Sequence, residues 1–418
     1  MRRVCCRYVW AAACSCVALI LAGLVLKSYH HSRFPWIVLS TYRPKLQSLA
    51  ANVPAPAAID VPAAPQCKPR RNIFFLKTHK CASSTVMNIF LRYGVTHDLY
   101  FVLPRDKKTN YVGHPRLFNR RMVLNLRPLN VTYNIFTHHS RFQKKEVAEV
   151  MPQDTVYVTI VRAPEFLFNS LYNYYNVKKY LHVELHDLLR NRTLLNKFKE
   201  RRKRKGAKHG QNQIGFDMGL DVMKNQDATS IDKFIKHIQE SFDLVMITER
   251  MDESLVLLKH LLCWTTEDIV AFKHNANNKA SYSVDLSDDD KARLRKLNYI
   301  DVKIYQHFAK IFDQKVVEFG IVRMAREVAE LQQVSDDFFD ACKKLQEKRD
   351  IANVPKKKRI YLPRRFQDVG MKETCKLLTM SELQFHDFVW RKQNATLRSK
   401  MWMSAAFAPP HQKKKKKS

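Results

Sequence analysis

A short apolar run that leads directly into a polar turn says most about how this chain folds. Residues 72–76 (NIFFL) are followed by a turn at 77–85 (KTHKCASST) and by a helix-like stretch at 86–93. An uninterrupted apolar run of this length is typical of a strand buried on both faces of a parallel sheet. Strand, polar loop and helix in this order form the first half of a βαβ unit. We therefore expect an α/β domain that begins near residue 72.

Further apolar runs of the same kind follow, and each ends at polar residues. These predicted strands lie at 132–136, 155–161 and 242–247. The helices predicted by apolar spacing lie at 165–176, 252–263, 288–312 and 313–349. Strands that alternate with helices favour a mostly parallel sheet flanked by helices, here with a helical C-terminal part.

The scarcity of glycine excludes two common phosphate-binding loops. Only 9 of the 418 residues are glycine, and neither G-x-G nor G-K-[ST] occurs. The dinucleotide fingerprint and the Walker A loop both need those glycines. Any phosphate site in this chain is therefore built without them.

The N-terminus predicts a membrane anchor. Residues 8–26 carry no charge and would span roughly 28 Å as a helix, close to the hydrocarbon thickness. The arginines in the tail at 1–7 favour a cytoplasmic N-terminus. A cleaved signal peptide is the alternative, although no clear cleavage site follows. We expect a type II protein with a proline-rich stem at 27–70 and a lumenal body at 71–418, whose core covers about 72–320.

Glycosylation sequons and cysteines agree with a lumenal body. Sequons begin at Asn130, Asn191 and Asn394. Outside the anchor region the chain has an odd number of cysteines, at positions 67, 81, 263, 342 and 375. At most two disulfides can form, so one thiol must stay free.

The formal net charge of +34 suggests an anionic partner or surface. Nucleic acid is the first expectation for such a balance, but the predicted anchor argues against it. The basic runs at 201–205, 356–359 and 413–417 have no assigned role.

The turn after the first predicted strand is a candidate anion site. It contains two lysines, Lys77 and Lys80, and its N–H groups lead into a helix N-terminus. It also offers four hydroxyls, on Thr78, Ser83, Ser84 and Thr85. A plain helix cap needs only one of these hydroxyls, so the two nearby lysines favour phosphate binding.

Two other strand ends carry groups that suit the same ligand, because ligands bind beyond the carboxyl ends of parallel strands. Arg162 ends the 155–161 run, and Ser170 lies about two helical turns later. The alternatives are a surface ion pair and an ordinary helix serine. His138 and His139 end the 132–136 run, where a neutral imidazole can act as a general base, although a lone histidine is more often a packed residue.

The segment NIFFLKTHKCASSTVMNIFLRYG closely resembles the phosphosulfate loop of the Golgi galactose-3-O-sulfotransferases, which include the galactosylceramide sulfotransferases. The segments NIFTHHSRF, TIVRAPEFLFNSLYNYY, NQIGFDMGLD and FDLVMITERMDESLVLLKHLLCW are similar to further blocks of that family, in the same order. The resemblance runs from about residue 72 to residue 264, and more loosely to the C-terminus.

This resemblance implies a P-loop-like sulfotransferase fold, 3′-phosphoadenosine 5′-phosphosulfate (PAPS) as donor and a β-linked galactose as acceptor. By position, Lys80 and the loop hydroxyls would bind the 5′-phosphosulfate, and Arg162 and Ser170 the 3′-phosphate. His139 would match the catalytic base, with His138 as its close competitor, and His79 corresponds to a histidine of the family loop. One departure is Cys81, which replaces the threonine of the common K-T-H-K-T pattern.

We therefore expect a Golgi membrane enzyme that moves the sulfuryl group of PAPS to the 3-hydroxyl of galactose on a glycolipid or glycoprotein glycan. The released product is adenosine 3′,5′-bisphosphate, and no metal and no nucleic acid is expected to take part. One alternative is a non-catalytic lumenal protein that binds polyanions or glycans. A lumenal kinase is the other, but the chain has no H-R-D or D-F-G motif to hold Mg²⁺. The sequence leaves the choice of acceptor and the oligomeric state open.

Overall fold

The computed structural model describes residues 67–126, 130–204, 210–224, 226–272, 286–350 and 370–406. The predicted anchor at 8–26 and most of the stem lie outside the described residues, and so do the basic runs at 356–359 and 413–417. Within the described part, no helix is both long and apolar enough to cross a membrane.

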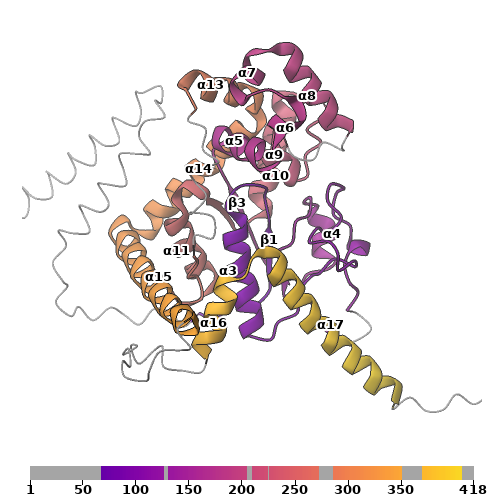
Figure 1. Cartoon of the computed structure of the whole chain (residues 1–418), viewed down its shortest axis with the longest axis vertical. Helices are drawn as coiled ribbons and strands as arrows, with labels where there is room; N and C mark the ends of the chain where they lie inside the picture. The colour runs from indigo at the N-terminus through magenta and orange to yellow at the C-terminus, as the bar shows by residue number, and fades with distance from the viewer. Residues whose placement is uncertain are drawn as a thin grey trace, which may run out of the picture. The chain divides into compact units, whose positions relative to one another are not determined.

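Strands and helices both occur up to residue 262, and the described elements after that residue are all helices (Figure 1). The strands are β1 (Ile73–Leu76), β2 (Ile135–Phe136), β3 (Val156–Val161) and β4 (Leu244–Ile247). The helices of the first part are α3 (Ser83–Thr96), η1 (Arg120–Met122), α4 (Lys144–Ala148), α5 (Pro164–Tyr174), α6 (Val177–Leu181), α7 (Leu185–Arg190), α8 (Arg192–Arg204), α9 (Gln213–Asp217), α10 (Ala228–Ser241), η3 (Thr248–Arg250) and α11 (Met251–Leu262). Those that follow are α13 (Asp288–Leu297), α14 (Tyr299–Phe319), α15 (Ile321–Asp350), α16 (Gly370–Thr379) and α17 (Glu382–Ala406).

The sheet is fully parallel, with the strand order β2-β1-β3-β4. Ile73 pairs with Ile135 on one side and with Val156 on the other, and Val158 pairs with Leu244. Every residue of the four strands is buried, as expected for a parallel sheet covered on both faces. The prediction of a parallel α/β sheet flanked by helices is confirmed, and it is consistent with a sulfotransferase fold.

The C-terminal helices pack against the first helix of the domain. α3 contacts both α16 and α17, and α11 lies between β4 and α15 (Figure 1). The side-chain amide of Gln393, on α17, donates to the carbonyl of Phe101 and accepts from its backbone N–H, at 3.0 and 2.8 Å. The amide of Asn88, on α3, donates to the carbonyl of Leu377 at 2.9 Å. The C-terminal segment is therefore bonded to the first third of the domain.

Three predicted boundaries are wrong. The predicted helix at 288–312 is two helices, because Asn298 ends α13 and its side chain bonds the carbonyl of Leu294 and the N–H of Asn212. The predicted helix at 313–349 starts only at residue 321, after Gly320 with a φ of 94°. The predicted strand at 132–136 forms only two residues of ladder.

The cysteine count is confirmed. Disulfides join Cys67 to Cys263 and Cys342 to Cys375, and Cys81 is the free, buried thiol. The second disulfide links α15 to α16, the helix that directly precedes α17 in the chain.

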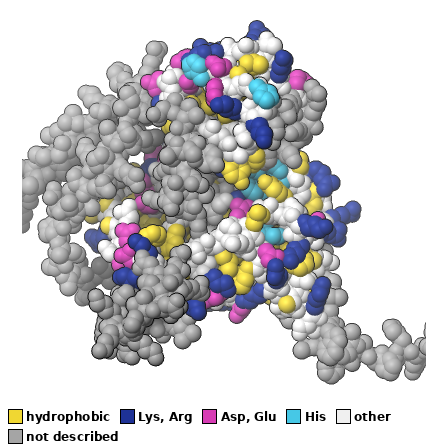
Figure 2. All heavy atoms as spheres, viewed as in Figure 1, with side chains coloured by type: hydrophobic (Ala, Val, Ile, Leu, Met, Phe, Trp, Pro, Cys, Tyr) yellow, Lys and Arg dark blue, Asp and Glu magenta, His cyan; other side chains and the backbone are white. Residues whose placement is uncertain are grey.

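The three sequon asparagines differ in exposure. Asn130 and Asn191 are exposed, whereas Asn394 is half-buried on α17. Lysine and arginine side chains are spread over the described surface on the face drawn in Figure 2.

Candidate active site

The loop between β1 and α3 has the backbone of a ligand site. Lys80 and Ala82 adopt left-handed conformations, with φ of 59° and 56°. Such conformations cost free energy in residues other than glycine and cluster at ligand sites. Inside the loop, the hydroxyl of Thr78 donates to the carbonyl of Ile160, and that of Ser83 to the carbonyl of Thr78, both at 2.5 Å. The Thr78 bond holds the loop against β3, and the Ser83 bond closes the loop on itself. The predicted phosphate contacts of Thr78 and Ser83 stay predictions.

Two cations of the predicted donor site meet at this loop. Nη1 of Arg162, just after β3, donates to the carbonyl of Lys80 at 3.1 Å. Nζ of Lys80 lies 3.6 Å from the ring centroid of Tyr174, which is 63% exposed. Burial, followed by the charges of Arg162 and Lys77, lowers the pKa of Lys80 to about 8. Positive charge is therefore concentrated here, and a bound anion would relieve it, which fits a phosphosulfate ligand.

The positions of Ser170 and Thr85 do not test their predicted roles in donor binding. Ser170 lies in the second half of α5, half-buried, two turns beyond Arg162. Thr85 lies in the first turn of α3, where its N–H donates to the carbonyl of Ala82 at 3.0 Å. Their roles in donor binding stay predictions.

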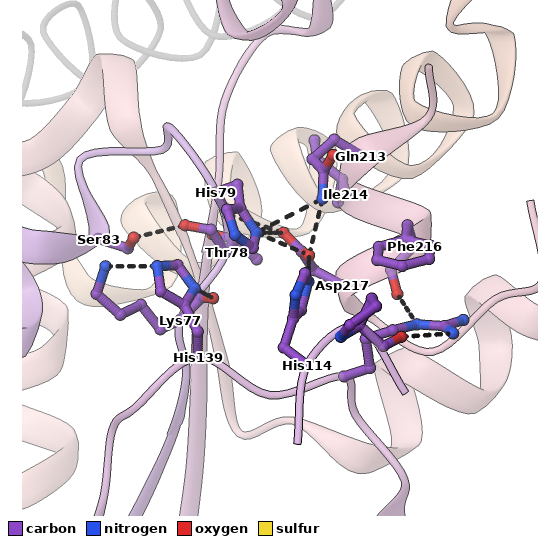
Figure 3. A network of polar contacts seen from close by, with 12 residues as sticks. Lys77, Thr78, His79, Ser83, His114, His139, Gln213, Ile214, Phe216 and Asp217 are labelled. Carbon is purple, nitrogen blue, oxygen red and sulfur yellow. Dashed lines mark hydrogen bonds and ion pairs between the residues drawn. The ribbon is translucent and has the colours of Figure 1, made fainter. Parts of the chain in front are cut away.

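The second lysine of the loop bonds to the predicted base. Nζ of Lys77 lies 3.0 Å from Nε2 of His139, 3.1 Å from the hydroxyl of Ser84 and 3.1 Å from a carboxylate oxygen of Glu382 (Figure 3 shows the first of these). Nδ1 of His139 lies 2.9 Å from the carbonyl of Lys77, which can only accept, so Nδ1 carries the proton and Nε2 is an acceptor. Burial, then the charge of Lys77, holds the pKa of His139 well below 6.5. His139 is therefore a neutral imidazole whose acceptor nitrogen receives a hydrogen bond from an ammonium.

His138 points to a different neighbour. Its Nε2 lies 2.9 Å from Nδ1 of His386, and Nε2 of His386 lies 3.1 Å from the carbonyl of Lys107. His386 must donate to that carbonyl, so its Nδ1 accepts and His138 donates its Nε2 proton. Burial lowers the pKa of His138 to about 3. This geometry favours a packing role for His138 on the inner side of α17.

His79 is paired with a carboxylate and stacks on His139. Its Nδ1 lies 2.9 Å from Asp217 and its backbone N–H donates to the same carboxylate at 2.8 Å (Figure 3). The rings of His79 and His139 are stacked with centroids 4.1 Å apart. The ring of His114 lies 4.9 Å from that of His79, and its Nε2 is 3.8 Å from the same carboxylate. Burial would raise the pKa of Asp217, but the two histidines outweigh it and keep the carboxylate ionised. His79 and Asp217 lie at hydrogen-bond distance and form an oriented His–Asp pair; together with His114 they bring three potential metal-ligand atoms within 4.8 Å of one another.

Cys81 is the buried residue in the middle of the loop. It is fully buried, its Sγ donates to the carbonyl of His79 at 3.4 Å, and burial raises the pKa of its thiol. A neutral buried thiol is unreactive. The residue that departs from the family pattern therefore contributes packing here.

Three residues of the site were not found from the sequence: Tyr174, Asp217 and Glu382. Asp217 lies within the segment NQIGFDMGLD, and a charged residue between apolar neighbours is the one sequence feature that could have identified it. Tyr174 belongs to a run of aromatic residues at the end of α5 and gave no specific signal. Glu382 lies 298 residues from Ser84, and no local pattern connects the two.

The comparisons with known proteins show the family of the chain. A profile described as galactose-3-O-sulfotransferase matches residues 8–393. Galactosylceramide sulfotransferase of Mus musculus is 36% identical over 282 residues, which are 66% of this chain and 65% of that protein. The Homo sapiens protein of the same name is 35% identical over 340 residues, 77% of this chain and 78% of that protein. Galactose-3-O-sulfotransferase 3 of Mus musculus is 31% identical over 344 residues, which are 77% of this chain and 78% of that protein. No solved structure matches the chain. The chain therefore belongs to the galactose-3-O-sulfotransferase family and is a transferase of that type.

Proposed function

We propose that this protein transfers the sulfuryl group of PAPS to the 3-hydroxyl of a β-galactose residue on a glycolipid or a glycan. It does so as a type II protein of the Golgi membrane, anchored through residues 8–26 and with its catalytic domain in the lumen. The observation that carries the proposal is the contact of 3.1 Å between Arg162 and the carbonyl of Lys80. It brings the two predicted ends of the donor site, which are 82 residues apart in sequence, to one place.

The cations at the loop suit the donor. PAPS, when bound, supplies the sulfuryl group, and its nucleotide leaves as adenosine 3′,5′-bisphosphate. Lys80 and the loop N–H groups would hold the 5′-phosphosulfate and stabilise negative charge on the leaving oxygen. Arg162, with Ser170, would hold the 3′-phosphate through charge-assisted hydrogen bonds.

His139 is the proposed base. A sugar hydroxyl is a poor nucleophile, so a neutral imidazole must take its proton as the new bond forms. The hydrogen bond from Nδ1 to the carbonyl of Lys77 leaves Nε2 as the accepting atom. The stacked ring of His79, itself held by Asp217, supports the orientation of His139.

The test is transfer of labelled sulfate from PAPS to galactosylceramide, lactose-type and N-acetyllactosamine acceptors, with linkage analysis of the product. The wild type is expected to form a 3-O-sulfated galactose. His139→Ala is expected to lose about 10²–10⁴-fold in kcat, because that is what a positioned general base contributes. Calorimetry should show nearly unchanged binding of adenosine 3′,5′-bisphosphate to this variant.

Two results would contradict the proposal in different ways. If the wild type binds the nucleotide but transfers no sulfate to any of the acceptors, the chain is a binding protein and not an enzyme. If His138→Ala or His79→Ala abolishes turnover while His139→Ala does not, the base has been assigned to the wrong ring.

A further inference from the structure

A carboxylate from the C-terminal helix lies at the candidate active site. Oε2 of Glu382 is 3.1 Å from Nζ of Lys77 and 2.7 Å from the hydroxyl of Ser84, and Oε1 is 2.7 Å from the side-chain amide of Asn110. Its side chain is 22% exposed and that of Lys77 is 3% exposed. A negative charge beside a predicted anion site is unexpected, because it repels the ligand that the site must bind. It therefore calls for a reason of its own.

The proposed base supplies that reason. Nε2 of His139 must accept the proton of the acceptor hydroxyl, but the ammonium of Lys77 already donates to it at 3.0 Å. Proton transfer would also place an imidazolium directly beside an ammonium. Both difficulties are removed if Lys77 can turn away from Nε2 to another anionic partner. Among the described residues, Glu382 is the carboxylate that forms an ion pair with Lys77.

The surroundings of Lys77 leave few other partners. Ser84, His139 and Glu382 accept its hydrogen bonds. The charged and titratable groups around this cluster also include Lys80, His79, His114, Asp217, His138, Cys81 and Tyr111. The carboxylate of Asp217 is hydrogen-bonded to His79 and acts on Lys77 through its charge, which raises the pKa of that ammonium.

We propose that Glu382 is a positioning residue of the sulfuryl-transfer site, whose carboxylate takes the ammonium of Lys77 away from Nε2 of His139 so that this nitrogen can accept the proton of the acceptor hydroxyl. The inference rests on the proposed function. The proton moves from the hydroxyl oxygen to Nε2 as the bond from that oxygen to sulfur forms and the bond from sulfur to the leaving phosphate oxygen breaks. The other proton stays on Nδ1, which keeps donating to the carbonyl of Lys77. The imidazolium that results returns its proton to solvent after product release.

The charges of the pair support this role. Burial lowers the pKa of Lys77, while the carboxylate of Glu382 opposes that effect. Burial would raise the pKa of Glu382, but the charge of Lys77 and the hydrogen bonds from Ser84 and Lys77 outweigh it, so the pKa lies below its ordinary value. Each partner therefore favours the ionised form of the other. The bonds from α17 to the body of the domain, through Gln393 and His386, hold the carboxylate in place.

The test is Glu382→Gln, which removes the charge and keeps an amide oxygen for Asn110. We expect kcat at saturating PAPS to fall about 10- to 100-fold, which is a part of the ~10²–10⁴-fold that a positioned base contributes. Calorimetry should show binding of adenosine 3′,5′-bisphosphate as tight as in the wild type or tighter, because a repelling charge is gone. A loss of folding would weaken both turnover and nucleotide binding, so a lower kcat with undiminished binding separates positioning from structural damage. Leu383→Gln, on the neighbouring exposed residue, is the control and should match the wild type.

A double-mutant cycle makes the inference specific to Lys77. In the background Lys77→Met there is no ammonium to move, so adding Glu382→Gln should change kcat by no more than about twofold. The inference is overturned if the two substitutions act independently, or if Glu382→Gln alone leaves kcat unchanged. His139→Ala, measured alongside, keeps the two hypotheses apart: an inactive His139→Ala with a fully active Glu382→Gln rejects only the role of Glu382.

Discussion

The lowered pKa of Lys80 predicts that donor binding weakens at a pH where most lysines are still charged. Its pKa lies at about 8, because burial and the charges of Arg162 and Lys77 disfavour the ammonium. Only the ammonium attracts the phosphosulfate, so the free protein must carry this proton in order to bind tightly. The ammonium predominates below pH 8, and about a tenth of the molecules carry it at pH 9. The dissociation constant for adenosine 3′,5′-bisphosphate should therefore rise about tenfold from pH 7 to pH 9, which is about 1.4 kcal/mol.

Calorimetry at constant ionic strength measures this directly. Near pH 8 the wild type should take up about half a proton on binding, and buffers of different ionisation enthalpy reveal it. Lys80→Arg keeps the charge throughout this range and should bind with little dependence on pH. Lys80→Met should bind weakly at every pH. If the wild-type affinity is flat from pH 7 to pH 9, or if Lys80→Met keeps the same slope, Lys80 is not the titrating donor ligand.

Three further predictions follow from the fold and the loop. Arg162→Ala should weaken binding of adenosine 3′,5′-bisphosphate about 10- to 100-fold in calorimetry, because it removes a charge-assisted contact, and an unchanged affinity would exclude the arginine from the site. Cys81→Thr should keep transferase activity, because a hydroxyl can make the same bond to the backbone; an inactive but folded variant would give the thiol a role beyond packing. Gly94→Ala should lower the free energy of unfolding by about 1–3 kcal/mol and so lower the melting temperature, since a Cβ there would lie 2.6 Å from the ring of Phe101. Gly370→Ala, where nothing lies within 4 Å of the added carbon, is its control and should melt like the wild type.

The strand ends could be predicted because their signals are local. A buried parallel strand is a continuous apolar run, and the polar residues that end it lie at the carboxyl edge, where ligands bind. Arg162, the pair His138 and His139, and the loop at 77–85 were all predicted in this way. The boundaries near Asn298 and Gly320 were missed because the helical spacing continues across both, while a side-chain cap and a positive φ interrupt the backbone.

The partners of those groups could not be predicted, because tertiary contacts select them. Asp217 and Glu382 belong to helices with no motif, and each reaches the loop only in the folded chain, across 138 and 298 residues. The choice between His138 and His139 likewise depends on which neighbour each ring meets. One bonds His386 on α17 and the other bonds Lys77 in the loop.

The bond from Ser84 to Glu382 also bears on when the enzyme becomes complete during its synthesis. Domains tend to fold from the N-terminus while the ribosome is still extending the chain. The parallel sheet can assemble once β4, which ends at residue 247, has emerged, but the loop at 77–85 lacks its carboxylate until synthesis has reached residue 382. A nascent chain that stops between these two points would have the sheet without a finished catalytic centre, so the site matures after the sheet.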